Sequence, residues 1–146
     1  MATYSFLDVT ASLTGPTGVI DLGQGSANSE EGITQTMGGN KNTMTIGADG
    51  EVLHSLHADK SGTITVTLLK TSPLNKKLSL AFNAQSQSSA TWGNNVIVIR
   101  NTASGDISTA RSCAFQKQPD FNNAKEGGTV AWVFDCGKIA QLLGEF

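Results

Sequence analysis

Residues 63–68 alternate strictly between threonine and aliphatic side chains, and this pattern constrains the fold more than any other feature of the chain. Successive side chains of a β-strand point to opposite faces, so a period of two places one kind of residue on each face. The segment therefore predicts a half-buried strand. Its core face would carry Ile64, Val66 and Leu68, and its outer face would carry Thr63, Thr65 and Thr67.

Short segments of similar character recur along the chain and are separated by turns rich in glycine, proline and asparagine. In residues 42–46 the same alternation predicts that Met44 and Ile46 face the protein core, opposite Thr43 and Thr45. We predict strands at residues 4–13, 19–22, 33–37, 42–46, 63–69, 95–100, 107–115 and 129–135. This order predicts a mainly β fold, an antiparallel β-sandwich or partly closed barrel, as a single domain over residues 1–146.

One flanking α-helix is predicted at about residues 73–86. Ser72 is a favourable N-cap, and Pro73 suits the first helical position because its φ angle is already helical. The apolar residues then recur with helical spacing at Leu74, Leu78, Ala81 and Phe82, which predicts a single buried stripe. Lys76 and Lys77 lie off this stripe.

Residues 47–62 form an insert that is longer than most loops in compact domains. It is either a projecting β-arm or a loop that docks on a partner. We favour the docking element, with Asp49, Glu51, Asp59 and Lys60 available for pairing with opposite charges. A second glycine-rich loop, residues 23–32, ends in Glu30 and Glu31. It is also expected to contact a neighbour.

His54 and His57 are the two histidines of the chain, and their spacing gives no metal site. On a strand, residues three apart point to opposite faces, and a zinc site needs further ligands with fixed geometry. We therefore interpret both as polar residues of the arm, and we expect no metal and no cofactor.

The motifs of enzyme nucleophiles are also missing from the sequence. No Gly-x-Ser-x-Gly turn occurs, and neither Cys113 nor Cys136 has a histidine close in sequence. The chain is therefore expected not to be an enzyme. Both cysteines are expected as buried thiols in a reducing cytoplasm, and their separation in space is left open.

Charged residues make up 15% of the chain, against about 25% in typical domains, and the net charge is −2. A basic surface for nucleic acid is not indicated. Residues 1–40 carry a charge of −4 and residues 41–80 a charge of +2, an asymmetry that head-to-tail self-association can use. The longest aliphatic run, residues 96–99, is too short to span a membrane.

The aromatic residues leave two interpretations open. Trp92 and Trp132, with Phe115, Phe121 and Phe134, could form a carbohydrate-binding platform in a non-catalytic binding or baseplate module. The spacing of Trp132 and Phe134 on one strand favours core packing.

A set of motifs in the same order along nearly the whole chain resembles the tail tube proteins of contractile-tailed bacteriophages. The motifs are YSFLDVT at residues 4–10, GP at 15–16, EEGIT at 30–34, GADG at 47–50, LKTSPLN at 69–75, KQPD at 117–120, NAKEGGT at 123–129 and FDCG at 134–137.

This resemblance implies a structural virion protein that is assembled in the cytoplasm of the host bacterium. Copies of the chain would form stacked hexameric rings, with a channel for DNA. The expected partners are the tail sheath protein, the baseplate or tail initiator, the terminator, and the tape measure protein and DNA in the channel. The family has no catalytic residues to carry over.

Within such a tube, the hydroxyl-bearing strand faces are expected to line the channel, because cationic side chains there would retain phosphates. The predicted channel-facing residues are Thr43, Thr45, Thr63, Thr65 and Thr67. The predicted subunit contacts are Glu30, Glu31, Asp49, Glu51, His54, His57, Asp59 and Lys60, and Lys76 or Lys77 would meet the sheath.

Overall fold

The computed structural model describes residues 2–23 and 28–146; the side chains of residues 28–31 lie outside this description. The described elements are a 3-10 turn and β1 to β9 with one α-helix, α1. Their bounds are Phe6–Asp8, β1 Val9–Gly15, β2 Gly18–Asp21, β3 Asn28–Met37, β4 Asn42–Ile46, β5 Val52–Leu56, β6 Gly62–Leu69, α1 Leu74–Gln85, β7 Asn95–Asn101, β8 Ile107–Phe115 and β9 Thr129–Leu142.

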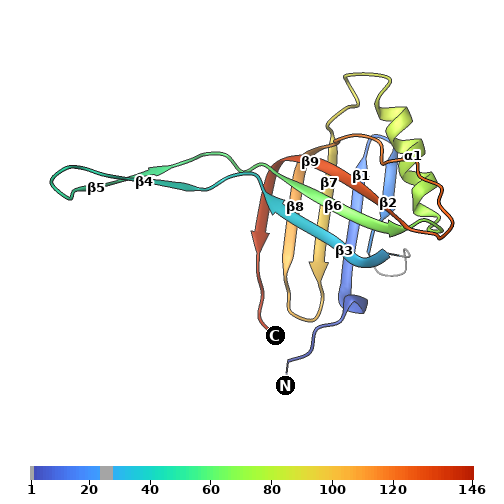
Figure 1. Ribbon diagram of the computed structural model, residues 1–146, viewed down its shortest axis with the longest axis horizontal. Helices are drawn as coiled ribbons and strands as arrows, with labels where there is room; N and C mark the ends of the chain where they lie inside the picture. Colours follow the sequence, from blue (N-terminus) through green and yellow to red (C-terminus); the bar gives the residue numbers. More distant parts are fainter. Residues whose placement is uncertain (1, 24–27) are drawn as a thin grey trace.

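Seven strands form one antiparallel sheet in the order β2-β1-β7-β8-β9-β6-β3, and β4 pairs with β5 in a separate two-stranded ribbon. Figure 1 shows this ribbon as a long arm that projects away from the sheet, while α1 lies at the opposite side. Both chain ends lie together at one end of the sheet. The fold is mainly β and antiparallel, as predicted, without a closed barrel.

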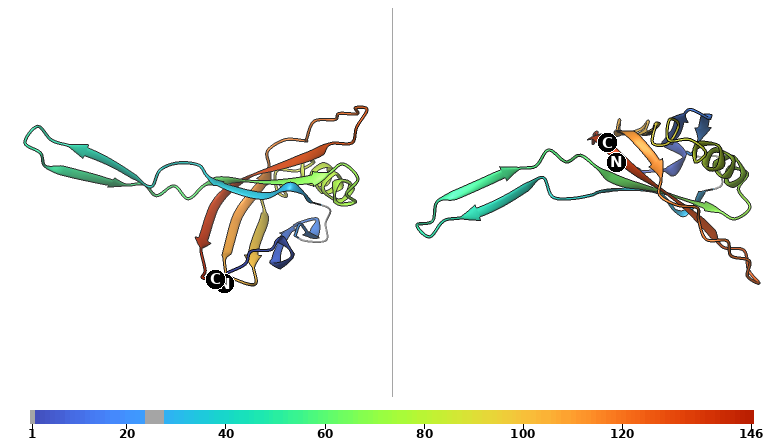
Figure 2. Two further views of the ribbon diagram at one scale, coloured as in Figure 1. Left: turned by 60° about the horizontal axis from the view of Figure 1, so that its bottom comes forward. Right: turned by 90° about the horizontal axis from the view of Figure 1, so that it is seen from above.

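The sheet bends along β9, because this strand has different neighbours along its length. Its first part, Thr129–Cys136, pairs with β6, whereas residues from Phe134 to the strand end pair with β8. A β-bulge in β8 lies at the bend: Ser112 has a left-handed φ of 54°, and Gly137 faces it. Bulges increase local twist and bend the strand. The two halves of the sheet therefore fold around a shared core (Figure 2).

The core contains the predicted aliphatic face of β6, since Ile64, Val66 and Leu68 are fully buried. Trp132 and Phe134 on β9 are buried beside them, which confirms their assignment to the core. Phe115 links these rings to Phe82 and Trp92 through aromatic contacts with centroids 4.8–6.5 Å apart.

Helix α1 confirms the predicted stripe: Leu74, Leu78 and Ala81 are buried, and Phe82 packs against the core. The Oγ of Ser72 accepts a hydrogen bond from the N–H of Leu74, so the expected capping side chain lies at the helix start.

A buried pair of amides fastens the last turn of α1 to the sheet. Gln85 Nε2 donates to Asn95 Oδ1 at 2.9 Å, and Asn95 Nδ2 donates to Gln85 Oε1 at 2.7 Å. Asn95 Nδ2 also donates to the carbonyl of Cys113, which connects this pair to β8. Each buried amide therefore has hydrogen-bond partners, as burial requires.

Residues 42–46 are the main error of the sequence prediction. They form a strand, but it belongs to the arm, so Met44 and Ile46 are 57% and 54% exposed and do not face the core. Alternation predicts the strand and its two faces, and it carries no information on what covers them. The strand β5 was not predicted, because residues 47–62 were read as an insert.

Three strand boundaries also differ from the prediction by five residues or more. β1 begins at Val9, because Phe6–Asp8 form a 3-10 turn capped by Ser5. β9 continues past residue 135 to Leu142 by pairing with β8. β3 begins at Asn28, inside the predicted loop, and residues 24–27 of that loop are outside the description.

Candidate assembly surfaces

The arm has two chemically different faces, which follow from its register. Paired residues of an antiparallel ladder share a face. Met44 pairs with His54, Ile46 with Val52, and Asn42 with Leu56, so one face carries four apolar side chains. The opposite face carries Thr43, Thr45, Ser55 and Leu53.

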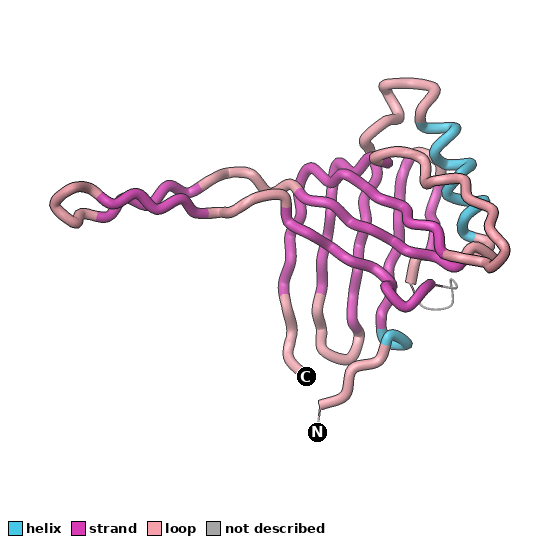
Figure 3. Tube along the Cα trace, viewed as in Figure 1, coloured by secondary structure: helices cyan, strands magenta, loops and turns pink. Residues whose placement is uncertain are grey.

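The apolar arm face is exposed to a degree that is unusual for such residues. The exposed fractions are 57% for Met44, 54% for Ile46, 51% for Val52 and 83% for Leu56. Figure 3 shows that loops join the arm to the sheet on both sides, so the ribbon stands free of the core. We call these four residues the apolar arm face.

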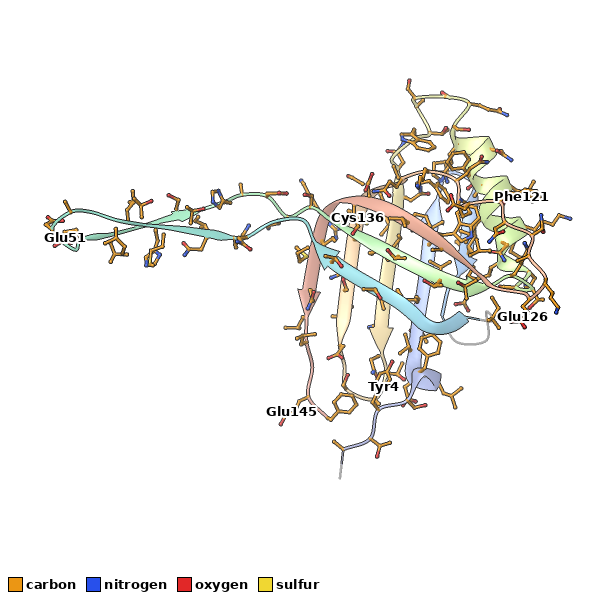
Figure 4. The ribbon with its side chains drawn as sticks, in the orientation of Figure 1. Tyr4, Glu51, Phe121, Glu126, Cys136 and Glu145 are labelled. Atoms are coloured by element: carbon orange, nitrogen blue, oxygen red, sulfur yellow. The ribbon has the colours of Figure 1, made fainter. Side chains whose placement is uncertain are left out.

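The far end of the arm is acidic. Gly47 N–H donates to the Glu51 carbonyl, and Asp49 Oδ1 accepts the N–H of Glu51, which closes the turn between the strands. Figure 4 places Glu51 at the end most distant from the sheet. Asp49 and Glu51 are both exposed, so their carboxylates are available to a cation outside the chain.

The base of the arm is mostly basic. Lys41, Lys60 and Lys138 are exposed around a shallow depression that also contains His57 and Asp59. The side-chain and backbone hydrogen bonds from Ser61 hold the pKa of Asp59 below its ordinary value of 3.8. Lys41 and Lys138 had not been predicted as contact residues, because the base of the arm is assembled from segments far apart in the sequence.

The two histidines lie on the arm without a shared ligand geometry. The Nδ1 of His54 accepts a hydrogen bond from Asn42 Nδ2, and His57 Nε2 is hydrogen bonded to Thr43 Oγ1 at 2.6 Å. Asn42 and Thr43 are neighbours on β4, so they point to opposite faces and hold the two imidazoles apart. The part of the chain that the structure describes contains no group of three or more metal-ligating side chains.

The outer face of β6 is a second, broader surface. Thr63 and Thr65 are partly exposed, whereas Thr67 is buried. Farther along β8 and β9, exposed Arg111 and Lys138 pair with each other. The strand register extends the part of the face beside β6 across four strands, and none of its positions there holds lysine or arginine. Its members are Thr34 and Thr36 on β3, Thr63 and Thr65 on β6, Ala131, Val133 and Asp135 on β9, and Ala114 on β8.

The structure separates the five threonines into two groups. Thr43 and Thr45 lie on the arm, whereas Thr63, Thr65 and Thr67 lie on the large sheet. The side chains of Glu30 and Glu31 are outside the described residues. Lys76 and Lys77 are exposed on α1, away from its buried stripe.

The aromatic residues do not form the ligand platform considered above. Trp132 and Phe134 are buried, and Trp92 packs edge-on against Phe82. Phe121, in contrast, is 94% exposed in the loop between β8 and β9 (Figure 4). No helix among the described residues is long and apolar enough to cross a membrane.

Solved structures with this fold come from contractile injection systems. A chain of an extracellular contractile injection system, the PVC sheath-tube complex in the extended state, has a TM-score of 0.57 and 10% identity, with 97% of this chain and 92% of that chain covered. A chain of the PVC sheath/tube terminator has a TM-score of 0.60 and 12% identity, with 97% and 98% covered. A chain of the anti-feeding prophage baseplate has a TM-score of 0.51 and 14% identity, with 97% and 96% covered.

No curated protein matches the chain. The family described as Bacteriophage PhiTE tail tube protein matches residues 1–144, almost the full length. This chain, with its curved sheet, projecting arm and flanking helix, belongs to that family of phage tail tube proteins.

Proposed function

We propose that this tail tube protein forms hexameric rings that stack into a hollow tube, and that DNA passes through the tube into the host. The main observation in support of this proposal is the exposure of the apolar arm face, together with membership of the family. An isolated two-stranded ribbon is only marginally stable in water, and three or more strands or a packed face are needed for independent stability. A neighbouring copy that covers the arm supplies that packing.

The side chains involved give the contact its chemistry. Met44, Ile46, Val52 and Leu56 would bury against an apolar surface of the next subunit. Burial of apolar area is favourable by about 25 cal/mol per Å². The polar face, with Thr43 and Thr45, would remain toward the channel.

Charge at the two ends of the arm would orient the contact. Asp49 and Glu51 at the tip are acidic, whereas Lys60 at the base lies among other lysines. In a stack of identical rings, the tip of one copy would meet a basic region of the next copy. Opposite charges at such a contact accelerate encounter and set the register. His54, His57 and Asp59, together with Glu30 and Glu31, would complete the subunit contacts.

Edge pairing would close the ring. β2 and β3 are the two edge strands of the large sheet. Exposed edge strands are templates for pairing with another chain, which is a hazard in a monomer and an assembly device in a ring. Edge-to-edge pairing of neighbouring sheets would make a continuous wall.

The outer face of β6 would line the channel. Thr63 and Thr65 belong to a part of this face that contains Asp135 and no cationic side chain, and Thr67 follows them on the strand but is buried in the single chain. DNA would not be held there, because phosphate retention requires lysine or arginine. We propose a structural and non-catalytic role for this wall.

The remaining partners are proposed from the similar structures. Those structures are a sheath-tube complex, a tube terminator and a baseplate. The corresponding partners of this chain would be a sheath that contacts Lys76 or Lys77 on α1, a terminator and a baseplate or tail initiator. A tape measure protein would occupy the channel before DNA, and assembly would take place in the host cytoplasm.

The structural similarity to a baseplate chain supports a second candidate function, that of a baseplate module that forms one ring without stacking. Negative-stain electron microscopy of the concentrated protein separates the two functions. Hollow tubes of uniform width support the tube subunit. Single rings that do not stack, even with tail initiator present, support the baseplate module, and a persistent monomer would contradict both.

A variant without the arm tests directly whether the apolar arm face is needed for tube assembly. The N–H of Gly38 donates to the carbonyl of Ser61 at 2.9 Å, so the two ends of the arm already adjoin. Replacing residues 40–59 by an Asn-Gly turn should leave the circular dichroism spectrum of the sheet unchanged and abolish tubes. The matched control Asp49→Asn with Glu51→Gln keeps the apolar arm face and should still form tubes, with less dependence on salt.

A further inference from the structure

The two cysteines, which are far apart in sequence, meet in the core. Cys113 on β8 pairs directly with Cys136 on β9, and their Sγ atoms are 3.1 Å apart. Both are reduced and buried, with exposed fractions of 0% and 3%. The tube function proposed above makes no use of this pair.

The ladder geometry of the pair suits a covalent link. The N–H of Gln116 donates to the carbonyl of Val133 at 2.9 Å, so residues 116 and 133 are a hydrogen-bonded pair. Because hydrogen-bonded and non-hydrogen-bonded pairs alternate, Cys113 and Cys136 form a non-hydrogen-bonded pair, with Cα atoms about 4.5 Å apart. This separation lies within the range of about 4.4–6.8 Å found in disulfides.

The surrounding structure holds both cysteines in place. The carbonyl of Cys113 accepts a hydrogen bond from Asn95 Nδ2, and Asn95 is itself bonded to Gln85 of α1. On the other side, Cys136 lies in the segment of β9 that pairs with both β6 and β8. The sulfur atoms therefore face each other before any reaction occurs.

We propose that Cys113 and Cys136 are a modification site, at which a small peroxide converts the two thiols into a cross-strand disulfide. The reaction uses one hydrogen peroxide molecule per pair. The Cys136 thiolate attacks one peroxide oxygen, the O–O bond breaks, and a sulfenic acid and one water form once the thiol proton is taken up. The sulfur of Cys113 then displaces the hydroxyl group, which leaves with the Cys113 proton as a second water. Two thiols are oxidised and one peroxide is reduced.

The direction of the hydrogen bond between the two sulfur atoms indicates which of them attacks the peroxide. The Cys113 thiol donates toward the sulfur of Cys136, which lowers the pKa of Cys136. The same contact, together with burial, raises the pKa of Cys113. The thiolate is the reactive species, so Cys136 reacts first and Cys113 resolves the sulfenic acid.

The disulfide would stabilise the bend of the sheet. It would close a loop with a sequence separation of 23 residues, which includes the exposed segment between β8 and β9. Cross-linking reduces the conformational freedom of the unfolded chain, and for a loop of this length the melting temperature should rise by on the order of 10 °C.

Intact mass spectrometry after peroxide treatment tests the proposal. The folded protein is treated with hydrogen peroxide, quenched with catalase, unfolded, and alkylated with N-ethylmaleimide. Untreated protein should carry two adducts. Treated protein should carry none, with the mass lowered by two hydrogens, and a phosphine reductant should restore both adducts and the original melting temperature. Two adducts after treatment, or added oxygens without the link, would overturn the proposal.

Cys113→Ser is the matched control, since its hydroxyl can still donate toward Cys136. Treatment of this variant should trap a sulfenic acid on Cys136, detectable with dimedone, and should give no rise in melting temperature. If the variant gained the same thermal shift as the native protein, the shift would not come from the disulfide. The measurements on the native protein do not depend on whether the variant folds.

Discussion

Strands β4 and β6 have nearly the same local pattern and opposite environments. Both alternate threonine with large apolar residues, yet Ile64 on β6 is fully buried, whereas Ile46 on β4 is 54% exposed. β6 lies between β3 and β9 in the large sheet, and β4 pairs with β5 in the arm. The difference teaches that alternation encodes a strand with two faces, while the neighbours of that strand determine whether its apolar face is buried.

The largest difference between the two strands should appear when their isoleucines are truncated. Ile64→Ala should reduce the free energy of unfolding by about 2–5 kcal/mol, because it leaves a cavity in the core. Ile46→Ala, the matched change on the arm, should alter it by less than about 0.5 kcal/mol. Urea unfolding of the unassembled protein measures both values, and equal losses would contradict the difference in burial.

The glycines at the junction of arm and sheet allow the second comparison. A Cβ at Gly62 would lie 2.4 Å from the carbonyl oxygen of Thr36 and 2.8 Å from the side chain of Ile139. A Cβ at Gly39 would meet one atom, of Asp59, at 4.0 Å. Gly62→Ala should therefore reduce the free energy of unfolding by about 1–3 kcal/mol through backbone shifts. In the same denaturant titration, Gly39→Ala should have almost no effect; a similar loss in both variants would mean that the junction is not tightly packed at Gly62.

Two asparagines extend the comparison to polar side chains. Asn95→Ala leaves the buried amide of Gln85 without its main partner and should lower the free energy of unfolding by about 1–3 kcal/mol. Asn42→Ala removes an exposed hydrogen bond to His54, and water replaces it. The second change should stay within about 0.5 kcal/mol. Thermal unfolding of both variants checks the order, which would be wrong if Asn42→Ala were the more harmful.

The smallest effect concerns the charge at the base of the arm. The hydrogen bonds from Ser61 lower the pKa of Asp59 below 3.8, so their stabilising contribution is present above that pH and is lost as the pH falls through the folded-state pKa. Ser61→Ala should raise the pKa of Asp59 toward 3.8, whereas Ser55→Ala, elsewhere on the arm, should not change it. A carboxyl NMR titration measures this pKa, and an unchanged value in Ser61→Ala would rule out the assigned cause.

Much of the large sheet could be predicted because local pattern and burial agree there. The stripe of α1, the aliphatic face of β6, and the burial of Trp132 and Phe134 all follow from the spacing of apolar residues, since those residues pack against elements with the same preference. The ordered motifs along the chain likewise indicated the tail tube family, which the match over residues 1–144 confirms.

The exposure of the apolar arm face and the cluster of lysines at the base of the arm could not be predicted in the same way. Met44 and Ile46 have the residue types and spacing of core positions, and their exposure depends on the separation of the arm from the sheet. Lys41, Lys60 and Lys138 come from distant segments that meet only after the chain has folded. The pairing of Cys113 with Cys136 likewise depends on the register of β8 and β9.

The sequence by itself determined where most strands and the helix form and which side of each is apolar, because backbone periodicity and side-chain hydrophobicity act within a few residues. Only the tertiary structure decided which strands share a sheet, which apolar faces are covered and which side chains meet. These outcomes depend on contacts between residues far apart along the chain, as the burial of β6 and the exposure of the arm demonstrate.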